Sequence, residues 1–148
     1  MGDYTAKTDA KGRVFLPAPL RKVLEREGEE RLVLRPDVFK PCLVLYPESL
    51  WNDILDKMRN RLNRWNARHQ EILRQFVAVA EVVELDGNGR FLLNKRKMQY
   101  AGITADVVFL SVDDRIELWD KDRYESQLLP PEELGQMLSE VLGEESDG

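Results

Sequence analysis

The sequence predicts an α+β protein, mainly β with helices, that is built from two tandem halves. The first observation is a repeat: residues 9–16 (DAKGRVFL) return 77 positions later as residues 86–93 (DGNGRFLL). The second is that each copy precedes a helix-like stretch and then two short apolar segments of strand character, in the same order. A duplicated half-fold predicts internal pseudo-symmetry and places two equivalent Gly-Arg turns on one molecule.

The first half is expected to contain two strands around its turn, a short helix, two more strands and a longer helix. Their ranges are 4–8, 14–16, 17–27, 32–35, 42–46 and 47–62. Pro17 and Pro19 are tolerated in the first turn of the short helix, and Gly28 is a plausible stop. The longer helix is indicated by apolar residues at helical spacing: Leu50, Trp51, Ile54, Leu55, Met58 and Leu62. Helical character continues at 72–76, after a basic middle.

The second half repeats this order. Its expected strands are 77–85, 91–93, 107–111 and 115–119, and its expected helices are 95–101, 122–128 and 131–142. Asn94 is a good cap for the first of these helices, and Gly102 is a good stop. The chain therefore divides into a first half-motif with its trailing helix (1–60), a basic linker (61–80), a second half-motif (81–129) and a C-terminal helix with an acidic tail (130–148).

Charge is unevenly distributed along the chain. The net charge is −5, but residues 130–148 alone carry six acids and no base, so the remainder is close to neutral. Residues 57–76 hold six bases against one acid, which is typical of a solvated helix face, a contact with an acidic neighbour or a second DNA surface. One cysteine (Cys42) and one histidine (His69) argue against a disulfide and a structural zinc site. We expect no cofactor, no metal, no membrane span and a cytoplasmic location.

The repeated turn has a physical logic. A glycine supplies the positive φ that a tight turn needs, and an aspartate can accept backbone N–H groups at its entrance. Arg13 and Arg90 then follow at a fixed offset, where a guanidinium suits phosphate oxygens or the acceptor atoms of guanine. The alternative is a surface Asp–Arg ion pair with no ligand. Two copies in register favour the ligand-binding interpretation.

The pattern of residues 9–21, D-x-x-G-R-x-x-L-P-x-x-L-R, resembles the signature of the MraZ family, bacterial regulators with two tandem half-motifs of the AbrB/SpoVT swapped-hairpin type. The resemblance extends over nearly the whole chain, through residues 43–51, 74–86 and 115–120. It implies a double swapped-hairpin, AbrB-like β-barrel in which the halves interleave. It also implies a ring-shaped homo-oligomer that associates with the nucleoid. Such proteins bind short direct repeats in promoter DNA of the division and cell-wall gene cluster, usually as repressors.

The resemblance also implies a set of site residues. Lys11, Arg13 and Arg90 are carried over as DNA contacts, and Lys95 is expected to attract phosphates. The turn-forming residues are Asp9, Gly12, Asp86 and Gly89. The chain departs from the family at residues 93–98 (LNKRKM), where a Leu-Pro step before an arginine is usual. Lys95, Arg96 and Lys97 are therefore expected to add charge near the second turn.

Other interpretations compete with this one. Trp51 and Trp119 lie on apolar patterns and are expected in the core, whereas Trp65 suits an interface. An antitoxin-like module that binds a protein partner is the main alternative function, and a structural ring without a nucleic-acid role is another. No Ser–His–Asp, Walker or Rossmann signature is present, so an enzyme is not expected.

Overall fold

The computed structural model describes residues 2–147, in which the chain forms eight strands and six helices. The strands are β1 (Asp3–Lys7), β2 (Arg13–Phe15), β3 (Arg31–Pro36), β4 (Leu43–Pro47), β5 (Glu81–Glu84), β6 (Arg90–Leu92), β7 (Asp106–Val112) and β8 (Arg115–Asp120). The helices are α1 (Ala18–Arg26), α2 (Glu48–Arg61), α3 (Ala67–Ala78), α4 (Lys95–Ala101), α5 (Lys121–Gln127) and α6 (Pro131–Asp147). The α+β class predicted from the sequence is confirmed.

The order of the elements is duplicated. β1-β2-α1-β3-β4-α2 in the first half is matched by β5-β6-α4-β7-β8-α5 in the second. Helix α3 stands between these two series, and α6 follows the second. The repeat in the sequence therefore corresponds to a repeat in the structure.

The halves interleave through their strands. One antiparallel sheet has the order β1-β7-β8-β4-β3-β5, and β2 pairs with β6 in a separate two-stranded ribbon. Four pairings, β1–β7, β4–β8, β3–β5 and β2–β6, join strands of different halves. Neither turn joins two strands that pair with each other, because each turn leads from the large sheet into the ribbon. Among the strands of the described chain, only β3–β4 and β7–β8 pair within one half, so each half depends on the other for the remaining strand pairings.

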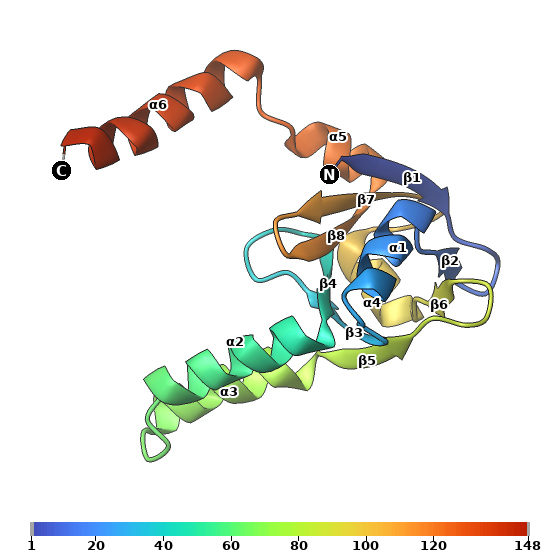
Figure 1. Cartoon of the computed structure of the whole chain (residues 1–148), viewed down its shortest axis with the longest axis horizontal. Coiled ribbons are helices and arrows are strands. Elements are labelled where there is room, and N and C mark those ends of the chain that lie inside the picture. Colours follow the sequence, from blue (N-terminus) through green and yellow to red (C-terminus); the bar gives the residue numbers. More distant parts are fainter. Residues whose placement is uncertain (1, 148) are drawn as a thin grey trace.

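The closed barrel implied by the family resemblance is wrong for residues 2–147, because the six-stranded sheet is open, with β1 and β5 at its edges. β2 and β6 could close the sheet only by pairing with these edges. Each is three residues long and pairs with the other instead, so strand pairing is not continuous between β1 and β5 through the ribbon. The ribbon is visible in Figure 1 beside the two turns.

Alternate residues of the central strands β3 and β4 pack into two different hydrophobic clusters, one on each face of the sheet. Leu32 and Leu34 on β3 face the main core with Val14, Phe91 and Phe109. The intervening β3 residue and its β4 neighbours face the other way, in a second cluster of Val33, Val44, Tyr46 and Trp51. Burial on both faces explains why these strands are apolar without interruption. Trp51 and Trp119 are buried, as expected, and Cys42 is fully buried.

Helices α2 and α3 form a hairpin that projects from the sheet (Figure 1). Phe76 of α3 stacks on Trp51 of α2 with 5.3 Å between ring centroids. Helix α3 continues to Ala78, so the strand predicted from residue 77 begins only at Glu81. The valines at 77–83 suited a strand, but Val77 and Ala78 continue the helix whose preceding residue, Phe76, stacks on α2. Trp65, at the tip of this hairpin, is 89% exposed.

Helix α6 stands away from the rest of the protein (Figure 1). All of its residues from 131 to 142 are exposed. Several large apolar side chains are among them: Leu134, Met137, Leu138, Val141 and Leu142. Across residues 2–147, no helix has both the length and the apolar character needed to cross a membrane.

Candidate nucleic-acid interface

The first turn is organised by one carboxylate. Oδ1 of Asp9 accepts the backbone N–H groups of Lys11 and Arg13, both at 2.9 Å. Oδ2 accepts the Nε–H of Arg13 at 2.7 Å. The Asp9 carbonyl accepts the N–H of Gly12 at 3.0 Å, which closes the turn. One side chain thus fixes both the backbone of the turn and the direction of its arginine.

The second turn repeats these bonds. Oδ1 of Asp86 accepts the N–H groups of Asn88 and Arg90 at 2.9 Å, and Oδ2 accepts the Nε–H of Arg90 at 2.9 Å. Hydrogen bonds from the following arginine's backbone N–H are the main cause that lowers the pKa of both aspartates. Both carboxylates are therefore ionised at neutral pH, as the ion pairs require.

Both arginines keep donors for a ligand. The ion pair to each aspartate uses Nε, and within residues 2–147 the η nitrogens of Arg13 and Arg90 have no hydrogen-bond partner. The side chains are 37% and 25% exposed. The surface ion pair that competed with the ligand-binding interpretation is thus present, but it orients each guanidinium and leaves its outer edge available.

The ribbon brings the turns together. Arg13 stands opposite Leu92, Val14 opposite Phe91 and Phe15 opposite Arg90. Because side chains alternate across a strand, the two central residues point into the core and the other four point outward. The two arginines are separated by about 7 Å along the ribbon. Figure 1 shows both turns on one side of the molecule, opposite the α2–α3 hairpin and α6.

The outward face of the ribbon also carries apolar side chains. Phe15 and Leu92 are 52% and 55% exposed. The guanidinium of Arg90 lies over the ring of Phe15, 5.6 Å from its centroid, and a leucine occupies the equivalent place opposite Arg13. Sequence reasoning missed both apolar residues. The signal was available, because each follows its arginine by two positions and so shares its face.

Backbone contacts between the halves position the turns. The N–H of Leu16 donates to the carbonyl of Gly89 at 3.0 Å, and the N–H of Leu93 donates to the carbonyl of Gly12 at 2.8 Å. The φ angles of Gly12 and Gly89 are 86° and 82°, a region that favours glycine. Each glycine thus allows the turn of one half to lie against the chain of the other half.

The basic start of α4 lies beside the first turn, so the expectation that it adds charge near the second turn is wrong. The antiparallel ribbon sends the end of β6 past the first turn, where Leu93 bonds to Gly12. Lys95 and Arg96 are exposed there. Lys97 is only 8% exposed, and its Nζ lies 3.4 Å from Oε1 of Glu81. Lys97 is therefore paired inside the protein.

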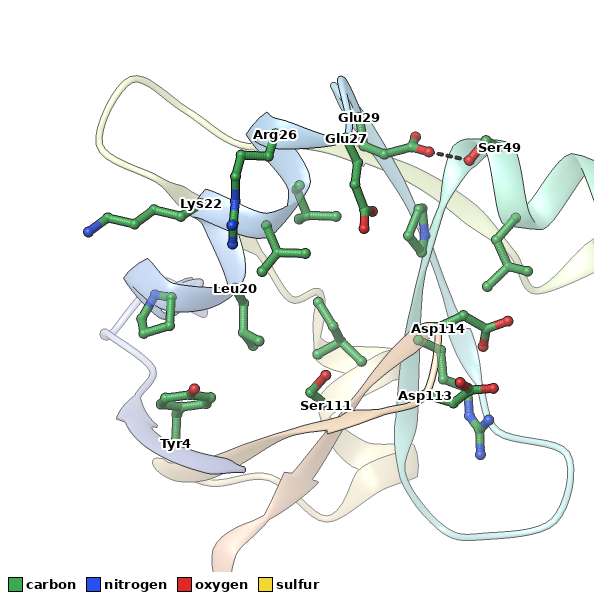
Figure 2. Close-up of a pocket in the computed structure, with 17 residues that line it drawn as sticks. Tyr4, Leu20, Lys22, Arg26, Glu27, Glu29, Ser49, Ser111, Asp113 and Asp114 are labelled. Carbon is green, nitrogen blue, oxygen red and sulfur yellow. Dashed lines mark hydrogen bonds between the residues drawn. The ribbon is translucent and has the colours of Figure 1, made fainter. Parts of the chain in front are cut away.

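A groove of about 630 Å³ lies between α1, the tip of the β7–β8 hairpin and the start of α2. Figure 2 shows Lys22 and Arg26 on one side of it and Asp113 and Asp114 on the other. No residue of either turn lines it, nor does the single histidine. Within residues 2–147, no cluster of three metal-binding side chains exists. Among the described residues, this groove therefore contains neither a Ser–His–Asp catalytic triad nor a metal site.

The fold and these turns define a class of small α+β proteins that present two arginines on a ribbon shared by two interleaved halves. The family model described as "MraZ protein, putative antitoxin-like" matches residues 1–75 and 76–135. The chain belongs to the MraZ family. A Bacteroides fragilis protein named "Transcriptional regulator MraZ" is 51% identical over 145 residues, covering 98% of this chain and 92% of the relative.

Two further relatives carry the same name. The Phocaeicola vulgatus protein is 52% identical over 143 residues, covering 97% of this chain and 93% of its own length. The Serratia proteamaculans protein is 31% identical over 143 residues, with the same coverage. The similarity therefore spans both halves in each relative.

Proposed function

We propose that this protein is a transcriptional regulator that binds double-stranded DNA through the outward face of the β2–β6 ribbon and the turns at its ends. The observation that carries the proposal is the pair of arginines, each aimed by its own aspartate and each with η nitrogens that have no hydrogen-bond partner in the described part of the chain. A two-stranded ribbon fits the major groove of B-DNA, and a guanidinium there can donate two hydrogen bonds to guanine.

The residues divide by chemistry. Arg13 and Arg90 are proposed to contact base edges, because their orientation is fixed. The exposed ammonium groups of Lys11 and Lys95 suit phosphates, since a flexible point charge positions the protein without reading sequence. Asp9 and Asp86 hold the turns rather than bind the ligand. The name of the relatives supports a regulatory role.

We also propose that the chain forms a homo-oligomer, with a closed ring as the expected arrangement. The apolar side chains of α6 are uncovered within the chain, which favours a protein partner. The acidic α6 and the basic α2–α3 hairpin have opposite charge, so the second copy is the occupant that suits them. Linked ribbons in one assembly would gain affinity for repeated sites by effective concentration. The resemblance to the MraZ family adds the expected target, which is direct repeats in the promoter of the division and cell-wall gene cluster. Binding there would place the protein on the nucleoid and repress transcription.

Selection of bound DNA from a random pool tests this function. The wild-type protein should enrich a short repeated motif at moderate salt. Arg13→Ala should relax the motif and weaken binding to the selected DNA by about 1–3 kcal/mol for each bidentate arginine–guanine interaction that it removes. Arg115→Ala is the matched control, because Arg115 pairs with Glu117 on β8 and lines the groove that no turn residue reaches. No enrichment by the wild-type protein, together with a stoichiometric protein partner, would support the antitoxin-like alternative.

A further inference from the structure

The second turn is covered by a guanidinium from the first half. Arg21 lies on α1, and its Nη1 donates to the carbonyl of Asn88 at 3.4 Å. A Cβ added to Gly89 would lie 2.8 Å from Cδ of Arg21, so this side chain lies directly on the turn. Arg21 is the last residue of the D-x-x-G-R-x-x-L-P-x-x-L-R pattern, yet the sequence did not indicate which turn it would reach.

The first turn has an uncharged side chain at the equivalent place. Met98 is the counterpart of Arg21 in the repeat, and its sulfur would lie 3.5 Å from a Cβ added to Gly12. A second difference has the opposite sign, because the first turn carries Lys11 where the second carries Asn88. Apart from Lys95 and Arg96 at the start of α4, each turn therefore has one further cation besides its own arginine, supplied by the turn itself in the first case and by α1 in the second.

The charge of Arg21 is not used inside the protein. No carboxylate forms an ion pair with it among residues 2–147, and its Nε is buried without a hydrogen-bond partner. Because Nε is buried, an external anion cannot reach it; Nη2 also has no hydrogen-bond partner among residues 2–147, but it is not buried and can meet a ligand. A cation held against a proposed DNA-binding turn, with no internal counter-ion, is suited to an external anion.

We propose that Arg21 binds a DNA phosphate at the second turn, where it takes the place that Lys11 has at the first. This inference rests on the function proposed above and names a residue that supports it. The bond to the Asn88 carbonyl holds the guanidinium beside the turn. The phosphate contact of the second turn thus comes from the first half of the chain, and the place of Lys11 is taken by a residue of α1.

Exchange of residues between the turns tests the assignment. Arg21→Met places a methionine over the second turn, as Met98 lies over the first, but the second turn has no lysine equivalent to Lys11. This substitution should weaken binding to selected DNA about tenfold and make the slope of log affinity against log salt shallower by about 0.9 for each second turn engaged. Arg21→Met combined with Asn88→Lys reproduces the first turn and should restore both quantities. Lys22→Met is the matched control, because it removes the neighbouring charge of α1, which lines the groove.

An unchanged salt slope in Arg21→Met, or no recovery in the double variant, would overturn the assignment. Thermal unfolding of each variant shows whether the fold is kept. If Arg21→Met does not fold, Arg21→Lys replaces it as the test. Arg21→Lys retains the charge and should keep the wild-type slope of log affinity against log salt. A slope shallower by about 0.9 in this variant would count against phosphate binding by Arg21. Salt-insensitive binding by the wild-type protein would reject the DNA-binding function as a whole. Loss of binding in Arg90→Ala with normal binding in Arg21→Met would reject only the role of Arg21.

Discussion

Alanine at the two turn glycines should have unequal effects on stability, although the turns are duplicates. Both glycines have positive φ, so alanine costs about 1–2 kcal/mol at either position. At Gly12 the new Cβ would also lie 2.5 Å from the carbonyl oxygen of Leu93, which is backbone and cannot rotate away. At Gly89 the nearest atoms belong to the flexible side chain of Arg21. The two substitutions therefore differ in what must move.

The difference can be estimated. Relief of the contact at Gly12 displaces the residue whose N–H donates to the Gly12 carbonyl at 2.8 Å, and a weakened hydrogen bond adds about 1 kcal/mol. Gly12→Ala should thus cost about 2–3 kcal/mol and Gly89→Ala about 1–2 kcal/mol. For a chain of this length the melting temperature should fall by about 2–4 °C per kcal/mol.

Thermal unfolding at one fixed protein concentration measures both changes, since an oligomer melts at a concentration-dependent temperature. Gly28→Ala is the matched control. Gly28 has φ of 72°, and an added Cβ would meet no atom within 4 Å, so this variant reports the conformational cost alone. The reasoning is refuted if Gly12→Ala is no less stable than Gly28→Ala. A larger loss at Gly89 than at Gly12 would also refute it.

Three other measurements test separate parts of the account. Titration followed by NMR should give Asp9 and Asp86 pKa values below the ordinary value near 3.9. Because folding lowers these pKa values, the ionised carboxylates stabilise the fold above about pH 4, and this stabilisation is lost as the pH falls through the lowered values. Ordinary pKa values would contradict the hydrogen bonds described for the turns. Burial raises the pKa of the Cys42 thiol, so a thiol reagent should label it only as the protein unfolds; rapid labelling of the native protein would contradict its burial. Glutamate at Leu138 and Val141, which are 51% and 58% exposed, should reduce the mass measured by light scattering, and an unchanged mass would exclude α6 from the assembly contact.

The sequence predicted most elements because local signals and packing agree there. The duplicated turns, the caps at Asn94 and Gly102 and the apolar strands are each encoded within a few residues. Asn94 accepts the N–H of Lys97 at 2.9 Å, and Gly102 adopts the left-handed conformation, as its position after the helix predicts. These features do not depend on which strand pairs with which.

The errors concern contacts between distant residues. Residues 77 and 78 look like strand locally, but they continue α3, which is anchored on α2 by the stacking of Phe76 on Trp51. The basic start of α4 follows the second turn in the chain, yet the antiparallel ribbon places it beside the first. For the same reason Arg21 reaches a turn 67 residues away. The repeat alone does not specify that β2 pairs with β6. This pairing has to be known before the contacts of α4 with the first turn and of Arg21 with the second can be predicted.

The most direct test of the central claim compares two double variants of equal net charge. Arg13→Ala with Arg90→Ala removes the aimed guanidinium groups, whereas Arg26→Ala with Arg115→Ala removes two arginines that line the groove away from both turns. Fluorescence anisotropy with the selected DNA, at one salt concentration, should show a decrease of about 2–6 kcal/mol in binding free energy for the first variant. The second should bind nearly as well as the wild type. Equal affinity in the two variants would contradict the account, because net charge alone would then explain binding.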